Sequence, residues 1–292
     1  MLPQWFVGFF LRHRKLGQMA LSMVPDVRRR IRIDPIGPFE IRLRRHRSYW
    51  IRSPLAQERL MLGYLERLIQ PGDVVYDVGA NVGLYTRFMS RFGAGRTVAF
   101  EPMSENIALL KRNVSLANGD AAKIQIMPLA VGDADGSELL QIDDVMSGTA
   151  SLDRVLGGQA SFGRKLYGYG PLTERVRVAK LDSLVFGENL PPPRVMKIDI
   201  EGAEMLALRG AERVLREHHP DLAIELHGEN MVKEVLAHLH EHGYACFAYV
   251  KEGKKHVYRR VYPHEAGSMM GYDHIVASTR PEMLEAPISP YS

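Results

Sequence analysis

The fold of this chain is indicated most clearly by a short apolar run that ends in regularly spaced glycines, Val74 to Gly83. Val74 to Val78 are β-branched or aromatic apart from Asp77, which is typical of a parallel strand buried on both faces. Leu84 to Phe92 follow with apolar residues at helical spacing, which predicts a helix. The glycines therefore lie in a turn at the carboxyl end of a strand, where open α/β sheets bind their ligands.

The spacing of the turn residues favours one class of nucleotide cofactor over another. A dinucleotide-binding turn reads Gly-x-Gly-x-x-Gly, whereas this turn reads Asp77-x-Gly79-x-Asn81-x-Gly83. Asn81 stands where the middle glycine of an acidic-x-Gly-x-Gly-x-Gly cradle would fall, and asparagine tolerates the left-handed conformation better than most residues. The pattern resembles the first motif of Rossmann-like S-adenosylmethionine (SAM) methyltransferases. An ordinary tight turn between a strand and a helix is the alternative.

A second predicted strand, Arg96 to Phe100, ends in an acidic residue, Glu101, which is followed by Pro102. Glu101 lies 22 positions after Gly79. A carboxylate at this place can accept hydrogen bonds from both ribose hydroxyls of an adenosyl cofactor. The alternative is a glutamate that caps the next helix or lies in solvent.

The third predicted strand, Lys123 to Val131, brings Leu129 and Ala130 to the same edge, where an adenine ring could lie against small apolar groups. Shorter strands are expected near 138–142 and 176–178. Between them, Ser147 to Pro171 is rich in glycine and serine, with cationic and aromatic side chains interspersed. Long segments of this kind are usually functional loops or disordered. We expect either a substrate lid or flexible surface here.

Two further strand ends carry ionisable groups. Val195 to Ile200 predicts a fourth core strand that runs into Glu201, and Leu222 to His227 predicts a fifth. Asp199 and Glu201 are two positions apart, so they face the same way if the strand conformation continues that far. His227 has the more suitable unperturbed pKa for a general base. The alternatives are a helix cap for Glu201 and an ordinary strand-end histidine for His227.

The positive charge of the chain is concentrated near its N-terminus. Residues 1–60 carry a net charge of +9, although the whole chain carries only +4. This asymmetry predicts contact of residues 1–52 with a membrane surface or another anionic partner, or else packing on an acidic domain. The apolar run Trp5 to Leu11 is too short to span a bilayer, and its positive charges follow it, unlike those of a secretory signal. Arg28 to Trp50 alternates apolar and basic residues around a turn, which predicts a small hairpin.

Composition narrows the class of protein further. The chain is 46% hydrophobic and 25% charged, which is an ordinary globular balance. The single cysteine, Cys246, excludes an internal disulfide and suits a reducing compartment. We therefore expect a cytoplasmic protein, with attachment to a membrane surface as the second option. The chain has no CxxC pair and no Cys/His cluster at zinc spacing, so no metal ligand is assigned.

Four stretches in this order resemble the FkbM-type methyltransferase family: Asp77 to Gly83, Phe100-Glu101-Pro102, Lys197 to Glu204 and Ile224 to His227. The resemblance implies a Rossmann-like class I α/β fold, with a seven-stranded mostly parallel sheet, helices on both faces and an antiparallel last strand. It implies a SAM-dependent O-methyltransferase that acts on a hydroxyl of a small molecule, sugar or glycan. The expected organisation is a basic extension (1–55), the methyltransferase domain (56–280) and a loose tail (281–292).

The resemblance also implies roles for individual residues. The methionine part of SAM is expected to contact Asp77, Gly79, Ala80, Asn81 and Gly83, the ribose Glu101 and Pro102, and the adenine Leu129 and Ala130. Asp199, Glu201 and His227 are the candidates for acceptor binding and for the general base. Asp199 lies nearest the expected sulfonium, and binding of the cofactor's amino group is its other option. A divalent cation on Asp199, Glu201 and Glu225 stays open, since carboxylates suit such ions.

Two other classes of function remain open from the sequence. A nicotinamide-dependent oxidoreductase is disfavoured by the missing middle glycine and by the absence of a Tyr-x-x-x-Lys pair. A binding protein docked on RNA or a membrane through its basic N-terminal segment is the second. Methylation of nucleic acid is disfavoured as well, because no aromatic-proline loop and no cysteine follows the fourth predicted strand.

Overall fold

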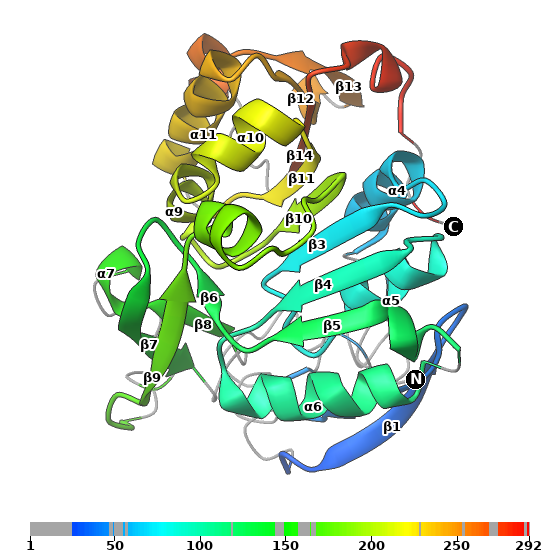
Figure 1. The fold of residues 1–292 in the computed structure, drawn as a ribbon, viewed down its shortest axis with the longest axis vertical. Coiled ribbons are helices and arrows are strands. Elements are labelled where there is room, and N and C mark those ends of the chain that lie inside the picture. Colours follow the sequence, from blue (N-terminus) through cyan, green and yellow to red (C-terminus); the bar gives the residue numbers. More distant parts are fainter. Residues whose placement is uncertain are drawn as a thin grey trace.

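The centre of the molecule is an eight-stranded sheet with helices on both faces (Figure 1). The computed structural model describes residues 25–46, 49, 55, 58–117, 119–143, 149–156, 164, 168–227, 229–252, 255–268, 274–288 and 291. In spatial order the strands are β13 (Lys255–Val261), β12 (Ala245–Glu252), β14 (His274–Ser278), β11 (Asp221–Glu225), β10 (Val195–Ile198), β3 (Val74–Val78), β4 (Arg96–Phe100) and β5 (Ile124–Met127).

The sheet is parallel from β5 through β4, β3 and β10 to β11. The next strand, β14, is antiparallel to both of its neighbours, which confirms the expected antiparallel last strand. The chain moves outward from β3 to β5 in one direction and from β10 to β11 in the other, so the strand order reverses between β3 and β10. Ligands of open α/β sheets bind at the carboxyl ends of the strands beside such a reversal.

The expected count of seven strands is corrected by β13, which pairs antiparallel with β12 at the edge of the sheet. The sequence predicts a basic hairpin tip at 251–256 and a last strand near 274–277, but no strand at 255–261. The strand forms because its aromatic residue has partners to pack on: the Tyr258 ring lies 6.4 Å from that of Tyr64 and 5.7 Å from that of Phe247. The added strand lies at the opposite edge of the sheet from β5, away from the predicted cofactor turn.

Helices cover the two faces of the sheet in separate groups. The described helices are α4 (Arg59–Leu68), α5 (Leu84–Arg91), α6 (Ser104–Ser115), α7 (Asp153–Leu156), α9 (Glu204–Arg209), α10 (Glu212–His218) and α11 (Glu229–Glu241), with shorter turns at Ala121–Lys123, Ser183–Gly187, Pro263–Ser268 and Pro281–Met283. Because side chains alternate along a strand, Tyr76 and Val78 belong to the core beneath α9, α10 and α11. Val75 belongs to the core beneath α4 and α5.

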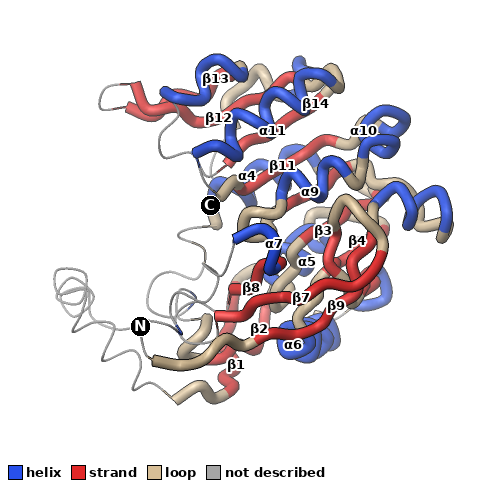
Figure 2. Tube along the Cα trace, turned by 90° about the vertical axis from the view of Figure 1, so that its left-hand side faces the viewer, coloured by secondary structure: helices blue, strands red, loops and turns tan. Residues whose placement is uncertain are grey.

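The predicted hairpin is present as β1 (Arg28–Ile33) and β2 (Gly37–Arg42), which pair antiparallel. Figure 2 shows this hairpin beside α6. Phe39 and Ile41 are fully buried in the core that contains α4 and α5. The Glu40 backbone N–H donates to Asn113 Oδ1 at 2.6 Å. The described part of the basic segment is therefore packed on the domain.

A second, four-stranded sheet lies beyond the carboxyl ends of β3, β4 and β5 (Figure 1). Its order is β6 (Ala130–Val131), β9 (Thr173–Ala179), β7 (Gly136–Asp143) and β8 (Thr149–Leu152). The strand predicted over 123–131 is thus divided between two sheets, since Pro128 has no N–H to continue the ladder of β5. The strands expected near 138–142 and 176–178 are confirmed as β7 and β9.

The C-terminal residues differ from the loose tail that we expected. Leu284 and Ile288 are buried in the core beneath α4 and α5. The backbone N–H of Tyr291 donates to the carbonyl of Arg59 at 2.8 Å, and its ring packs against Phe88. Because of this burial and these contacts, the described part of the C-terminal segment is packed on the domain rather than loose.

Several expectations concern residues outside the described part of the chain. These are the apolar run Trp5 to Leu11 and much of the segment Ser147 to Pro171. None of the helices in the described part has the length and apolar character that crossing a lipid bilayer requires.

Candidate functional site

The turn after β3 has the conformation that its spacing predicts. Gly79, Asn81 and Gly83 all have positive φ, at 84°, 49° and 91°. A Cβ on Gly79 would overlap the backbone oxygen of Asp199 at the end of β10. Glycine is therefore required at position 79 both for the left-handed backbone and for the close approach of two strand ends.

Asp77 differs from our expectation, because it lines neither of the two cavities at this edge of the sheet. It is fully buried on the α5 side of β3, where its Oδ2 accepts a hydrogen bond from the Thr86 hydroxyl at 2.5 Å. Its Oδ1 lies 3.5 Å from the ammonium nitrogen of Lys197. Asp77 therefore connects the residue before the turn to α5 through Thr86 and to β10 through Lys197. Gly83 also lies outside both cavity linings and begins α5.

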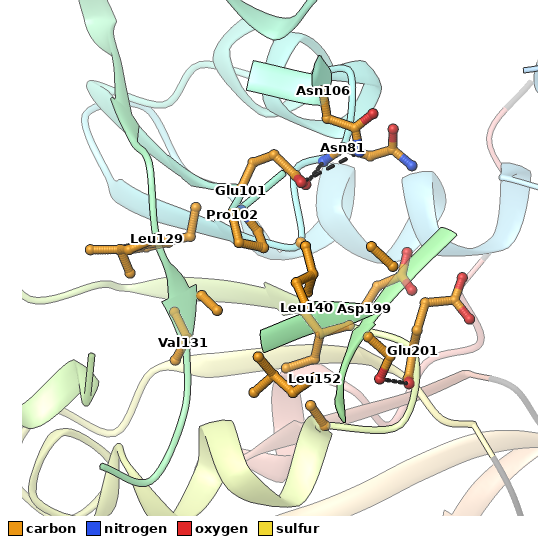
Figure 3. A pocket seen from close by; sticks show the side chains of 17 residues that line it. Asn81, Glu101, Pro102, Asn106, Leu129, Val131, Leu140, Leu152, Asp199 and Glu201 are labelled. Carbon is orange, nitrogen blue, oxygen red and sulfur yellow. Dashed lines mark hydrogen bonds between the residues drawn. The ribbon is translucent and has the colours of Figure 1, made fainter. Parts of the chain in front are cut away.

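The first cavity, which we call the Glu101 cavity, encloses about 700 Å³ of space, part of which is open to solvent. Figure 3 shows its walls, which come from the ends of β3, β4 and β10 and from the small sheet. Among its lining residues are the expected cofactor contacts Gly79, Asn81, Glu101, Pro102, Leu129 and Ala130. Residues far apart in the sequence thus meet as the motif spacing predicts.

Glu101 is a buried carboxylate held by three donors. Its Oε2 accepts from the backbone N–H of Asn81 at 2.8 Å, and its Oε1 accepts from the backbone N–H of Met103 at 2.9 Å. The Asn106 amide lies 3.4 Å from Oε1. Burial raises the pKa of Glu101 to about 7 against these hydrogen bonds. Oε2, which accepts from one donor, keeps a lone pair for a further donor such as a hydroxyl.

Asn81 offers a second unused acceptor in the same cavity. Its side-chain Oδ1 is buried, yet among the described residues it has no hydrogen-bond partner. Buried polar atoms are rarely left unpaired, because each costs about 1 to 3 kcal/mol. The Glu101 cavity therefore presents acceptor groups that suit a ligand with hydroxyl or amino donors.

The second cavity, the His227 cavity, opens on the other side of the same turn and has a volume of about 1050 Å³. Its lining includes Ala80, Asp199, Glu201 and His227, which are all predicted site residues. The two cavities share Gly79, Asn81, Asp199 and Glu201. A molecule in one cavity would therefore meet a molecule in the other at the ends of β3 and β10.

His227 is oriented by a buried carboxylate that we did not assign to the site. Its Nδ1 lies 2.9 Å from Oε1 of Glu204, which is fully buried at the start of α9. That oxygen also faces the backbone N–H of Gly202 at 3.1 Å, so it serves as an acceptor and Nδ1 carries the proton. Nε2 is left toward the cavity, 3.9 Å from Asp199 Oδ1 and 3.8 Å from Glu201 Oε2. This is the arrangement of a histidine base held by a carboxylate.

The carboxylates around His227 change its acidity. Burial disfavours the imidazolium, but the hydrogen bond to Glu204 and the charges of Glu204, Asp199 and Glu201 outweigh it and raise the pKa of His227 to about 9. Burial, supported by the charge of Asp199 and opposed by His227, raises the pKa of Glu201 to about 7. Glu201 has a φ of 52°, so the strand conformation assumed for it ends earlier, although both carboxylates still face His227.

Lys197 is the second residue that sequence reasoning did not assign. It is buried beneath the turn, and its ammonium nitrogen lies 3.2 Å from Asp199 Oδ2 and 4.5 Å from the centre of the Tyr85 ring. A lysine in the middle of a buried strand needs anionic partners. Asp77 lies directly opposite Lys197 in the register of β3 and β10, and Asp199 is two positions later in the sequence. That signal, a charged residue within an apolar strand, could have identified it.

The segment expected to form a lid contributes partly to the site. Ala150, Ser151 and Leu152 of β8 line the Glu101 cavity (Figure 3). The Ser151 hydroxyl donates to the backbone oxygen of Glu201 at 3.0 Å. The small sheet thus closes the cavity against the loop that follows β10. Most of the remaining residues of the expected lid lie outside the described part of the chain.

The acidic groups at this edge also bear on the open question of a divalent cation. Asp199, Glu225 and His227 each place one potential ligand atom within 4.8 Å of the others. Two competing contacts use the same carboxylates, since Asp199 faces Lys197 and Glu225 Oε2 lies 3.3 Å from His274 Nε2. We assign no metal to this group.

Comparison with known proteins places the chain among methyltransferases. A family model described as the methyltransferase FkbM domain matches residues 77–246. Methyltransferase 1 of Beauveria bassiana is 29% identical over 158 residues, and the alignment covers 51% of this chain and 60% of that protein. The hexuronic acid methyltransferase AglP of Haloferax volcanii is 26% identical, with 66% of this chain and 72% of that protein covered.

Two further similarities complete the comparison. The 31-O-demethyl-FK506 methyltransferase FkbM of Streptomyces tacrolimicus is 28% identical, with 62% of this chain and 75% of that protein covered. The crystal structure of methyltransferase FkbM from Methylobacillus flagellatus aligns at 16% identity with a TM-score of 0.45, covering 74% of this chain and 50% of that chain.

The family match extends from Asp77 in β3 to Cys246 in β12, which is more than half of the chain. It includes the cofactor turn, Glu101, the carboxylates after β10 and His227. The nicotinamide-dependent alternative thereby loses its support, and the expected family is confirmed. This chain is a methyltransferase of the FkbM domain family.

Proposed function

We propose that this protein is a SAM-dependent O-methyltransferase that acts on a hydroxyl of a small molecule, sugar or glycan. The observation that carries the proposal is the junction of the two cavities at Asp199 and Glu201. One cavity offers the unused acceptors of Glu101 and Asn81, which fit the hydroxyl and amino donors of an adenosyl cofactor. The other offers a histidine base. The relatives' names, which include a 31-O-demethyl substrate and a hexuronic acid, favour oxygen as the acceptor atom.

In the proposed reaction the chain mainly holds and orients the two partners. The bound cofactor supplies an activated methyl group on a sulfonium. Glu101 would hold the ribose, Asn81 and the backbone of the turn at Gly79 would hold the methionine part, and Leu129 and Ala130 would pack against the adenine. His227 Nε2 takes the proton of the acceptor hydroxyl. Asp199 and Glu201 would line the place where the acceptor and the cofactor meet.

The experiment that tests this function is a methyl-transfer screen with purified protein and SAM. Hydroxylated metabolites and uronic acid glycans are offered as acceptors, and S-adenosylhomocysteine and methylated product are measured. Calorimetric titrations with SAM and with NAD accompany the screen. Tight binding of NAD without any binding of SAM would overturn the proposal. Contact of residues 1–52 with a membrane or other anionic surface stays a separate prediction.

Replacing Glu101 by glutamine should weaken SAM binding by about 10- to 100-fold, because a hydrogen bond to a charged group contributes about 1.5 to 3 kcal/mol. Glutamine also turns an N–H group toward either Asn81 or Met103, both of which donate to Glu101. Calorimetry measures the affinity. Glu66→Gln, at an exposed position of α4, is the matched control and should bind normally. Equal affinities for the two variants would remove Glu101 from the cofactor site.

A further inference from the structure

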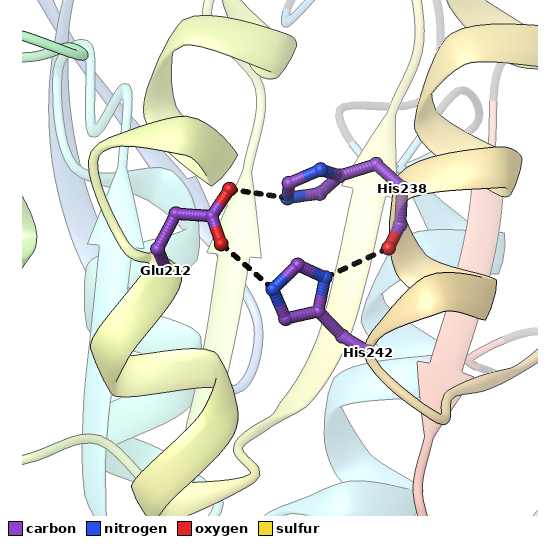
Figure 4. A group of neighbouring side chains, drawn as sticks. All are labelled: Glu212, His238 and His242. Carbon is purple, nitrogen blue, oxygen red and sulfur yellow. Dashed lines mark hydrogen bonds and ion pairs between the residues drawn. The ribbon is translucent and has the colours of Figure 1, made fainter.

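A separate group of potential metal ligands lies between α10 and α11, on the face of the sheet that these helices cover. Figure 4 shows Glu212 at the start of α10 facing His238 and His242. Glu212 Oε2 lies 2.8 Å from His242 Nε2, and Oε1 lies 3.8 Å from His238 Nε2. All three ligand atoms lie within 4.8 Å of one another. None of these residues lines the Glu101 cavity or the His227 cavity.

The hydrogen bonds of His242 fix which of its nitrogens faces the carboxylate. Nδ1 lies 2.9 Å from the backbone oxygen of His238, and a carbonyl oxygen can only accept. The proton is therefore on Nδ1, and the lone pair of the neutral ring is on Nε2, directed at Glu212. Two acceptors cannot face each other at 2.8 Å without a cation between them. That cation is either a proton or a metal ion, and metal-ligating histidines commonly donate their other N–H to a carbonyl in this way.

His238 adds a nitrogen that nothing else uses. Its Nε2 is buried and has no hydrogen-bond partner among the described residues. The side chain is only 11% exposed, whereas Glu212 is 44% exposed and leaves a path from solvent. The two histidines are four positions apart, so they project from one side of the helix.

We propose that Glu212, His238 and His242 bind a transition-metal ion of the Zn²⁺ type, which links α10 to α11. Two imidazole nitrogens and one carboxylate are ligands that Zn²⁺ accepts, with a water molecule completing four-coordination, whereas Mg²⁺ and Ca²⁺ prefer oxygen alone. In a tetrahedral site with bonds of about 2.1 Å the ligand atoms are about 3.4 Å apart, so small side-chain rotations suffice. The sequence signal of this site is the spacing His-x-x-x-His at His238 and His242. This spacing does not form a Cys/His zinc motif by itself, because the third ligand is a glutamate far away in the sequence.

The test uses the full chain, stripped of metal with a chelator and then titrated with Zn²⁺ by calorimetry and with Co²⁺ by visible absorption. Glu212→Gln, His238→Asn and His242→Asn should each weaken Zn²⁺ binding by more than about 100-fold, since changing even a residue that only orients a ligand costs about 10- to 100-fold. His240→Asn is the matched control, because His240 lies on the same helix but is exposed. Zn²⁺ should also raise the melting temperature of the wild type.

The variants distinguish this site from the catalytic edge of the sheet. Glu212→Gln changes a half-exposed side chain, so its fold, checked by circular dichroism without metal, should be unaltered. A single Zn²⁺ per chain that is lost in Glu212→Gln and His242→Asn and retained in His227→Asn supports the site. Loss in His227→Asn alone would place the ion at Asp199, Glu225 and His227 and overturn the proposal. Equal affinity in His240→Asn and His242→Asn would overturn it as well.

Discussion

Replacing Gly79 by alanine should destabilise the protein by about 2 to 5 kcal/mol. The left-handed backbone at this position, with a φ of 84°, costs an alanine about 1 to 2 kcal/mol. The added Cβ would also overlap the backbone oxygen of Asp199, and overpacking of this kind costs about 1 to 3 kcal/mol more. The two strand ends would have to separate, so SAM binding should be lost even where the chain still folds. Urea unfolding and calorimetry measure the two effects.

Gly72→Ala separates the two contributions. Gly72 has a similar φ of 91°, but a Cβ at that position would have no atom within 4 Å. Its substitution should therefore cost only the backbone strain of about 1 to 2 kcal/mol, with unchanged cofactor affinity. If the two alanine variants are equally stable and bind SAM equally well, the close approach of Gly79 to Asp199 does not shape the site.

Most of the residues predicted for the cofactor lie together at one edge of the sheet, because they are tied to strand ends. Gly79 and Glu101 directly follow the buried strands β3 and β4, and Asn81 and Leu129 lie within three residues of the ends of β3 and β5. Parallel strands bring their carboxyl ends to one edge whatever the loops do. Strands of this type are visible as apolar runs. The positions of these side chains could therefore be inferred from one sequence.

What the sequence did not reveal depends on contacts across the fold. Asp77 was assigned to the cofactor, but the side chains of a strand alternate between its faces, and the face of Asp77 points toward Thr86 of α5. Glu204 was noted only as part of a motif, since its role comes from the meeting of α9 with the end of β11. These partners lie 9 and 23 positions apart in the sequence and in different elements, and periodicity within one element cannot indicate them.

The additional strand and the packed tail have the same origin. Lys255 to Val261 carries basic residues that suggest a solvent-exposed hairpin tip, yet its ladder with β12 and the packing of Tyr258 on Tyr64 hold it in the sheet. Leu284 and Ile288 are isolated apolar residues among prolines, and they become buried by packing in the core that also contains α4 and α5. Tertiary contacts override local composition in both segments.

His227→Gln should lower kcat/KM by about 10²- to 10⁴-fold, the usual contribution of a general base. The raised pKa of His227, about 9 in the free enzyme, also fixes the pH dependence. A base must be neutral, so kcat/KM of the wild type should rise with pH up to about 9 and then level off. Glutamine does not titrate, and this rise should vanish in the variant. Methyl transfer measured across pH, with His240→Asn as the unaffected control, gives both quantities.

Glu204→Gln distinguishes the base from its neighbours. The amide oxygen can still accept from His227 Nδ1, but the negative charge that raises the pKa of His227 is gone. The rise in kcat/KM should then move to lower pH by about 1 to 3 units, as expected for the loss of an adjacent opposite charge. If Glu201 were the base, the rise would lie near pH 7, where burial places its pKa, and it would persist in His227→Gln. That profile would transfer the proton-accepting role from the histidine to the carboxylate.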